Sequence, residues 1–252
     1  MRRFLPLLFC AAAFAQPRDL QLFLLIGQSN MAGRGKIEAA DREPIPRVLM
    51  LNQELAWVPA IDPVHFDKPQ IAGVGIARTF GRVLAAANPS ATIGLIPAAF
   101  GGTSLEQWKP EGKLYADAVR RARFAMKSGR LRGILWHQGE ADATAQLAPT
   151  YRDRFAEFIS RLRADLDAAD VPVVVGELGE YLMADERHVY ARVVNEQLAL
   201  IPLKVPHSGF VSSAGLVHKG DGVHFDSPSV REFGRRYAHA FLSLDPAWES
   251  PR

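Results

Sequence analysis

A serine stands at a position of this chain where α/β enzymes place a nucleophile. Ser29 follows an apolar run that ends at Ile26. A serine on the first turn after a buried parallel strand lies at the edge of the sheet, where backbone N–H groups are free to point at its hydroxyl. Met31 stands where the second glycine of the G-x-S-x-G elbow of α/β-hydrolases would be, so this is a different motif. Ser29 is a candidate nucleophile, and the rest of the chain must supply a base and an oxyanion site.

A histidine and an aspartate near the C-terminus could supply that base. Asp221 and His224 lie three residues apart in a glycine-containing turn. The carboxylate can then accept from one imidazole N–H while the other ring nitrogen faces the serine. The D-x-x-H spacing also arises by chance, and other histidines compete for the role of base. Two of them, His188 and His239, lie in predicted helices, which favours a structural role for them. The competitors are His65, His137, His188, His207, His218 and His239.

Two further segments offer donors for an oxyanion. Gly101 and Gly102 allow the backbone to approach closely and turn an N–H outward. Gln138 offers a neutral side-chain NH₂. Each also has an ordinary explanation, a tight turn for the glycines and a surface amide for Gln138. Their positions after predicted strands favour the functional interpretation, because an oxyanion hole needs donors aimed at one point.

The C-terminal segment admits a second chemistry. Asp221, His224 and Asp226, with or without His218, are residue types that bind metal ions in metal-dependent hydrolases. Their mixed spacing matches no metal-binding motif, so we favour the serine mechanism and expect no metal. Resistance of the activity to a chelator would dismiss the metal site.

The alternation of apolar segments predicts a doubly wound α/β sandwich. Fully apolar runs are typical of strands buried on both faces of a parallel sheet, and the segments between them show the periodicity of amphipathic helices. The last helix is expected to have Ser227 as its N-cap and Pro228 at its first position. Ligands bind such sheets at the carboxyl ends of the strands. The predicted strands are 20–26, 92–96, 133–136, 171–178 and 209–212, and the predicted helices include 77–87, 119–126 and 151–166.

One long segment, residues 34–75, does not follow this alternation. It holds five prolines and has little periodicity. We expect it to be a surface excursion near the site that forms part of a substrate rim.

Length and composition indicate one domain behind an export signal. The chain has 252 residues, 48% of them hydrophobic, which suffices for a sizeable core. Residues 1–15 have the basic start, apolar stretch and A-x-A site of a secretory signal peptide, which leaves a single domain over 16–252. The only cysteine, Cys10, would leave with the signal. Cleavage lowers Lys+Arg from 30 to 28 against 27 acidic residues, and hence the net charge from +3 to +1.

Charge and hydropathy exclude two classes of partner for the mature chain. There is no dense stripe of Lys and Arg, so nucleic-acid binding is not expected. No other apolar run approaches the ~20 residues of a membrane span, so no membrane association is expected after signal cleavage. We therefore expect a secreted or periplasmic protein; its oligomeric state is left open by the sequence.

Four segments taken together resemble a known family. They are GQSNMAG at 27–33, GGTS-x-x-x-W at 101–108, WHQGE-x-D at 136–142 and DGVHF at 221–225. In this order they resemble the sialate O-acetylesterase-like branch of the SGNH (GDSL-like) hydrolases, which includes the acetyl xylan esterases of carbohydrate esterase family 6. The resemblance covers nearly the whole mature chain, and GQSNMAG and WHQGE are specific motifs.

The resemblance implies a role for each of these segments. Ser29 is the implied nucleophile and His224 the base, oriented by Asp221. The N–H groups of Ser29 and Gly102 and the side chain of Gln138 are implied to form the oxyanion hole. Glu140 is held as a supporting acid, which orients Gln138 or neighbouring loops. The family fold is a three-layer α/β/α sandwich with a mostly parallel five-stranded sheet, the flavodoxin-like SGNH hydrolase fold, and it implies no cofactor.

The resemblance also implies an activity. The expected protein is a serine esterase that removes O-acetyl groups from a carbohydrate, such as acetylated xylan or O-acetylated sialic acid, through an acetyl-serine intermediate. Trp57, Trp108 and Trp136 are candidate sugar-stacking faces, although Trp136 is better explained as a core residue. Two alternatives stay open, a short-acyl esterase of broad specificity and a non-catalytic carbohydrate-binding protein on the same fold.

Overall fold

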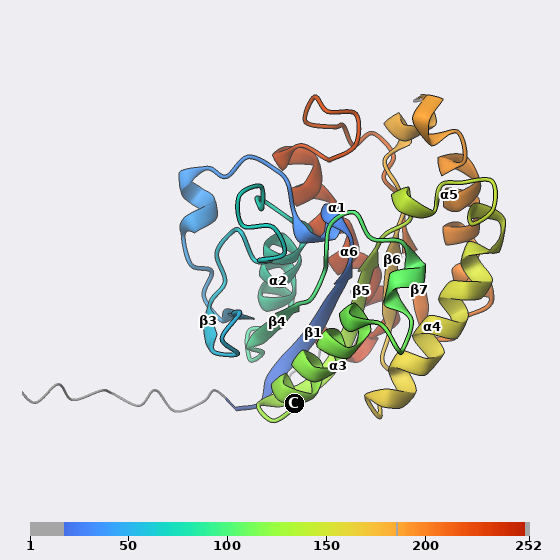
Figure 1. Cartoon of the computed structure of the whole chain (residues 1–252). Coiled ribbons are helices and arrows are strands. Elements are labelled where there is room, and N and C mark those ends of the chain that lie inside the picture. The colour runs from blue at the N-terminus through green and yellow to red at the C-terminus, as the bar shows by residue number, and fades with distance from the viewer. Residues whose placement is uncertain (1–17, 185, 250–252) are drawn as a thin grey trace, which may run out of the picture.

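The protein forms three layers, with helices on both faces of a central sheet (Figure 1). The computed structural model describes residues 18–184 and 186–249. The predicted signal peptide 1–15, with Cys10, lies outside the described residues. Within the described part, no helix is long and apolar enough to cross a membrane.

The sheet has seven strands in the order β3-β2-β4-β1-β5-β6-β7. Every neighbouring pair is parallel except β2 with β3. The predicted mostly parallel sheet is therefore confirmed, and the predicted number of five strands is wrong. The strands are β1 (Leu20–Gly27), β2 (Val48–Leu51), β3 (Trp57–Pro59), β4 (Ile93–Pro97), β5 (Gly129–His137), β6 (Val173–Gly176) and β7 (Ser208–Val211).

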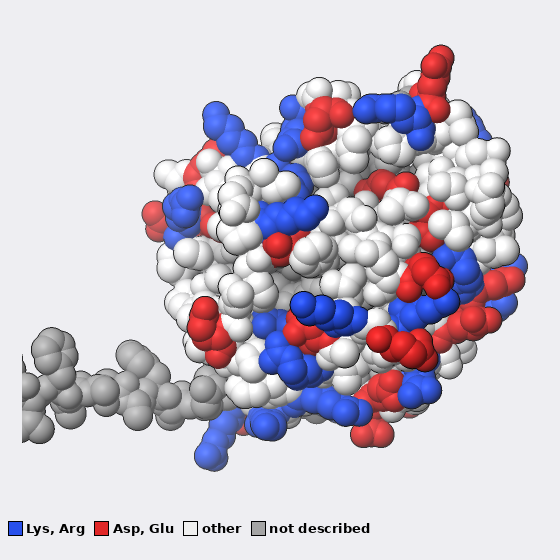
Figure 2. Space-filling view, viewed as in Figure 1, with Lys and Arg blue, Asp and Glu red and all other residues white. Residues whose placement is uncertain are grey.

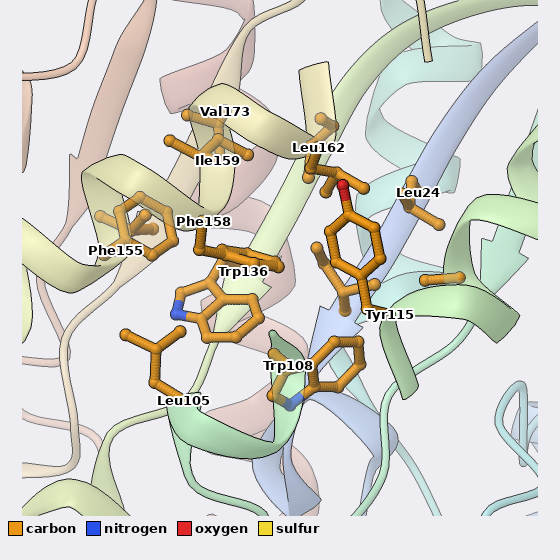
Figure 3. Close-up of a cluster of buried hydrophobic side chains, with 14 of the residues drawn as sticks. Leu24, Leu105, Trp108, Tyr115, Trp136, Phe155, Phe158, Ile159, Leu162 and Val173 are labelled. Carbon is orange, nitrogen blue, oxygen red and sulfur yellow. The ribbon is translucent and has the colours of Figure 1, made fainter. Parts of the chain in front are cut away.

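Both faces of the sheet carry an apolar core. Alternate residues of β1 point to opposite faces, because side chains alternate along a strand. Leu24 belongs to the core beneath α3 (Lys113–Ala125), α4 (Tyr151–Asp165) and α5 (Ala191–Ala199), and Phe23 to the core beneath α2 (Ile76–Ala87) and α6 (Ser227–Leu244). Figure 3 shows the first core, in which Trp108 and Trp136 meet edge to face with ring centroids 5.5 Å apart.

The two strands missed by the sequence analysis, β2 and β3, come from the proline-containing segment 34–75. They are four and three residues long and form an antiparallel pair at one edge of the sheet. Strands this short leave almost no periodic signal, and Pro59 ends β3 at an edge where a missing N–H costs little. The excursion is therefore anchored to the sheet rather than purely superficial.

The last helix begins one residue earlier than predicted. The Asp226 side chain accepts a hydrogen bond from Ser229 N at 2.8 Å, so Asp226 is the N-cap of α6 and Ser227 is already helical. Both residue types are good N-caps, and the sequence alone did not separate them. The short helix α5 was also missed.

Acidic and basic side chains are mixed over the face of the molecule in Figure 2. Exposed ion pairs such as Lys204–Asp153 and Arg161–Asp165 accompany this mixture. Such exposed pairs contribute little to stability.

The carboxyl ends of three adjacent strands meet at one edge of the sheet. β1 lies between β4 and β5, with Leu25 opposite Pro97 and Gly27 opposite His137. The segments that follow these strands are therefore neighbours although they lie far apart in the sequence. The segment before α6 reaches the same edge, since Asn30 hydrogen-bonds to both Val223 and Phe225.

Candidate active site

Ser29 is the first residue of the four-residue helix α1 (Ser29–Ala32), directly after β1. The turn into α1 needs Gly27, whose φ is +131° and whose Cβ would lie 2.1 Å from the carbonyl oxygen of His137. The first N–H groups of a helix have no acceptor within the helix. In the described part of the chain nothing accepts from Ser29 N–H. The nucleophile candidate thus carries a free donor of its own.

The structure brings Ser29, His224 and Asp221 into one hydrogen-bonded chain. His224 Nε2 lies 3.0 Å from Ser29 Oγ, and His224 Nδ1 lies 2.7 Å from Asp221 Oδ2. A proton on Nδ1 faces the carboxylate, which leaves Nε2 as an acceptor for the serine hydroxyl. This is the arrangement in which a histidine acts as a general base on a serine.

The Asp221 carboxylate also fixes the backbone of its own turn. Its Oδ1 accepts from Val223 N at 3.0 Å and from His224 N at 2.8 Å. Burial works to raise the pKa of Asp221, but the hydrogen bonds from His224 and Val223 outweigh it and hold the pKa well below its usual range. The orienting acid is therefore ionised at neutral pH.

The Gly101–Gly102 turn after β4 lies against Ser29. A Cβ on Gly101 would be 2.5 Å from Arg34 Nη2 and 3.3 Å from Ser29 Cβ, so a side chain there would displace the buried Arg34 guanidinium. Gly102 has a φ of +82°, which favours glycine for conformational reasons. Among the described residues, none accepts from Gly102 N–H. The turn thus offers a second free backbone donor beside the serine.

Gln138 lies differently from the prediction. Its side chain is fully buried, and its nitrogen has three acceptors: Asp142 Oδ2 at 2.7 Å, Thr103 O at 3.0 Å and Gln28 Oε1 at 3.2 Å. The nitrogen carries two hydrogens, which these acceptors occupy. The structure therefore leaves no side-chain N–H of Gln138 free for an oxyanion, and the amide joins three segments beneath the site.

Glu140 acts on the loop of His224 through Asn30. Glu140 Oε1 accepts from Asn30 Nδ2 at 2.7 Å, and the same nitrogen donates to Val223 O at 3.1 Å. Asn30 Oδ1 accepts from Phe225 N at 3.2 Å. Asn30 thus holds the backbone on both sides of His224. Glu140 orients this neighbouring loop, and it has no direct hydrogen bond with Gln138 among those described.

Comparison with known proteins assigns the chain to a family. A family model described as carbohydrate esterase, sialic acid-specific acetylesterase matches residues 19–243. The chain belongs to this family. A probable carbohydrate esterase of Arabidopsis thaliana is 31% identical over 243 residues, which cover 88% of this chain and 90% of that protein. The resemblance inferred from the four motifs is therefore confirmed.

Solved structures share the fold of this family member. An Arabidopsis thaliana structure has a TM-score of 0.82 at 29% identity and covers 89% of this chain and 98% of its own. NanS has a TM-score of 0.74, with 92% and 99% covered, and a carbohydrate acetylesterase from Xanthomonas citri has 0.68, with 89% and 56% covered. Both are 19% identical to this chain, so they show the fold alone.

Three of the competing histidines have other surroundings than Ser29, whereas His188 lies in the wall of the same cleft as Ser29 and His224. His65 is buried, and burial lowers its pKa to about 3. His137 is also buried, with Nδ1 at 3.2 Å from Tyr237 Oη. His218 Nδ1 accepts from Gly220 N and Gly222 N, so it shapes the turn that carries Asp221.

The alternative metal constellation is not assembled. Asp226 caps α6, His218 accepts from backbone N–H groups, and His224 faces Ser29. Over the described residues, no group of three or more His, Cys, Asp or Glu is placed to hold a metal ion. The three candidate metal ligands described above thus interact with different partners.

The sugar-stacking prediction is wrong for Trp108, and the core explanation of Trp136 is confirmed, because burial leaves neither ring free to stack on a sugar. Trp108 and Trp136 are fully buried in the core of Figure 3. Trp57 lies in β3 and is only partly buried against the same core, so its stacking role stays a prediction. An exposed aromatic near the site is instead Phe100, which is 39% exposed and directly precedes the Gly101–Gly102 turn.

A cleft of about 340 Å³ opens at Ser29 and His224. The segment 34–75, expected as a rim, contributes Arg34, Lys68 and the exposed Ile71 to its walls. The sequence analysis missed Arg34 as a site residue. Nothing in its local sequence marks it, because its partner Asp67 is 33 positions away and meets it only in the fold.

Proposed function

We propose that this protein is a serine esterase that removes acetyl groups from an O-acetylated carbohydrate. The observation that carries the proposal is the hydrogen-bonded chain of Ser29, His224 and Asp221 beside two free backbone N–H groups. Membership of the carbohydrate esterase family supports the same class of reaction. A binding protein would have no need of this arrangement.

The proposed reaction has two acyl-transfer steps. His224 takes the proton of Ser29 Oγ as the oxygen attacks the ester carbonyl, and the N–H groups of Ser29 and Gly102 hold the oxyanion. The carbon–oxygen bond to the sugar then breaks, and His224 gives its proton to the leaving alcohol. Water next attacks the acetyl-serine with His224 again as base, which releases acetate and restores Ser29.

The cleft and the relatives support a small acyl group on a sugar. A volume of about 340 Å³, shared between acyl group and alcohol, suits a short acyl chain. The Arabidopsis thaliana relative is named a probable carbohydrate esterase, and the family model names sialic acid-specific acetylesterase. Acetylated xylan and O-acetylated sialic acid are the proposed substrates to compare. The proposed site of action is outside the cytoplasm, after cleavage of residues 1–15.

Acetate release by the purified protein tests this function, with Ser29→Ala beside it. The substrates are 4-nitrophenyl acetate, 4-nitrophenyl butyrate, acetylated xylan and O-acetylated sialic acid. We expect release from one carbohydrate and its loss in Ser29→Ala, with the fold unchanged by circular dichroism. Equal turnover of the two nitrophenyl esters without carbohydrate turnover would indicate a broad short-acyl esterase. Binding of a carbohydrate by a folded protein that hydrolyses no ester would overturn the proposal in favour of a binding protein.

A further inference from the structure

A buried ion pair lies beneath the Gly101–Gly102 turn. Arg34 Nη2 and Asp67 Oδ2 are 2.6 Å apart, and their side chains are 2% and 1% exposed. The same carboxylate oxygen accepts from Gly101 N at 2.8 Å. Burial works to raise the pKa of Asp67, but the Arg34 guanidinium and the Gly101 N–H outweigh it and lower the pKa, so the group is an anion.

This pair joins the two segments that carry the proposed oxyanion donors. Arg34 Nη1 donates to Gly33 O at 2.7 Å, and Gly33 N donates to Ser29 O at 2.9 Å at the end of α1. On the other side, Asp67 holds Gly101 by its N–H. The two segments therefore have a common charged link in the interior, supplied by the excursion 34–75.

The N–H groups of this turn are divided between anchors and the site. Phe100 N donates to Gly27 O at 3.0 Å and Gly101 N donates to Asp67. Gly102 N is the next along the chain, and no described residue accepts from it. Two successive anchored N–H groups fix the orientation of the peptide that follows them, and a preorganised donor needs such fixing.

We propose that Asp67 is a positioning residue for the oxyanion hole, which fixes Gly101 N–H so that Gly102 N–H faces the space beside Ser29 Oγ. Arg34 holds the Asp67 carboxylate in place and balances its charge. The inference rests on the proposed esterase function and extends it to a segment that contributes no member of the catalytic triad. It gives the proline-containing excursion a role in the chemical step.

The first test replaces Asp67 and follows kcat and KM with 4-nitrophenyl acetate. Asp67→Ala removes the acceptor of Gly101 N–H, and we expect kcat to fall on the order of 10²-fold, the scale of one lost oxyanion donor, with KM within a few-fold of the wild type. Asp67→Asn keeps an acceptor oxygen, so it should retain more of kcat than Asp67→Ala. Wild-type kcat in Asp67→Ala would overturn the proposal.

A second variant covers the case in which an unpaired Arg34 prevents folding. Arg34→Met with Asp67→Leu removes both charges together, and apolar replacement of a buried pair is often tolerated. We expect this double variant to fold and to show the same fall in kcat as Asp67→Ala. A folded double variant with wild-type kcat would contradict the proposal.

A matched control separates positioning from general damage to the excursion. Asp41 belongs to the same segment, is 3% exposed and pairs with Arg231 at 2.6 Å, and none of its described bonds reaches the Gly101–Gly102 turn. Asp41→Asn should therefore leave kcat unchanged. An equal fall of kcat in Asp41→Asn and Asp67→Asn would show that both act only through the packing of the segment, against the proposal.

Hydrogen–deuterium exchange distinguishes failure of this inference from failure of the proposed function. We expect faster exchange in the peptide covering residues 98–105 in Asp67→Ala than in the wild type, and no change there in Asp41→Asn. Unchanged exchange in Asp67→Ala would overturn the positioning role even in an active enzyme. Absence of esterase turnover in the wild type would overturn the oxyanion role, while the exchange result would still report whether Asp67 fixes the turn.

Discussion

Two adjacent glycines at the candidate site are required for different reasons. A side chain at Gly101 would have to displace the buried Arg34 guanidinium, because a Cβ would lie 2.5 Å from Arg34 Nη2. Gly102 has room, with Lys68 Nζ at 3.9 Å as the nearest group, but its φ of +82° disfavours any other residue. One glycine therefore permits close approach to Ser29, and the other leaves its N–H without an acceptor among the described residues.

The amide of Gln138 allows a sharp test at the residue scale. Because its N–H groups are bonded to Asp142, Thr103 and Gln28, Gln138→Ala should act through this buried network. Loss of the amide leaves buried partners unpaired, and we expect the free energy of unfolding to fall by about 1–3 kcal/mol. Urea denaturation and kcat, measured on the same preparation, check this expectation.

The opposite result for Gln138 would restore the role implied by the family resemblance. A fall in kcat of about 10²-fold with unchanged stability is the signature of a lost oxyanion donor. In that case the amide must leave one of its present acceptors when substrate binds. Tyr151, which donates to Gln138 Oε1 at 2.8 Å, holds the other end of the amide and would limit such a movement.

At the scale of elements, the sequence predicted those that carry a long apolar signal. The runs at β1 and β6 and at residues 133–136 of β5 are buried and almost wholly apolar, so they were recognised as parallel strands. The segments after β1, β4 and β5 were recognised as site loops because the carboxyl ends of such strands meet at one edge. The strands β2 and β3 were missed because short edge strands with proline lack a periodic pattern.

The contacts between elements could not be predicted from the sequence, for a different reason. The pairing of Arg34 with Asp67 depends on how the excursion folds back on α1, and no local pattern encodes that path. Likewise, the burial of Trp108 depends on the packing of its ring against Trp136 of β5, which is distant in the sequence. Residue type and spacing made Ser29, His224 and Asp221 candidates, and the family resemblance assigned their roles, while the residues that hold them required the fold.

Replacement of Asn30 tests how the contact between two elements affects catalysis. It joins α1 to the loop before α6 through Val223 O and Phe225 N, on either side of His224. Asn30→Ala should let this loop move relative to Ser29, and displacement of a catalytic group by about 1 Å costs on the order of 10²-fold in rate. We therefore expect kcat/KM with 4-nitrophenyl acetate to fall by about that factor.

Asn195 provides the matched control for Asn30. It is also buried, and it holds the backbone of one residue, with Oδ1 accepting from Leu178 N at 2.9 Å and Nδ2 donating to Leu178 O at 3.1 Å. Asn195→Ala should lower the free energy of unfolding by about 1–3 kcal/mol, as should Asn30→Ala, because each leaves buried groups unpaired. Only Asn30→Ala should lower kcat/KM strongly. Similar kinetic losses in both variants would contradict a specific role of Asn30.

At the scale of the whole molecule, the site depends on segments from across the chain, from Ser29 to His224. The excursion 34–75 is held against the body of the protein partly by charged groups, such as Asp41 with Arg231 of α6. Asp62 in the same segment is 1% exposed, and its Oδ1 has no described partner. Loss of the proton from such a group affects the stability of the entire fold.

The buried Asp62 carboxyl is therefore expected to make the free energy of unfolding depend on pH. Burial raises the pKa of Asp62 from 3.8 to about 7, against the opposing effect of Arg78. Between these two values the folded protein binds more protons at this group than the unfolded chain, so the contribution of Asp62 to the free energy of unfolding falls as pH rises through that window. One pKa unit corresponds to about 1.4 kcal/mol, which gives a penalty of about 4 kcal/mol once the group is ionised in both states.

Asp62→Asn removes this penalty because the amide stays neutral at every pH. Relative to the wild type, the variant should gain about 2–3 kcal/mol of stability between pH 5 and pH 8, measured by urea denaturation. Asp41→Asn is the control: hydrogen bonds from Arg231 and Glu38 outweigh burial and lower the pKa of Asp41. Its stabilising effect is lost only as pH falls through the acid range below 3.8, so the difference between that variant and the wild type should stay constant from pH 5 to pH 8. An equally constant difference for Asp62→Asn would mean that Asp62 is ionised in the folded protein throughout this range.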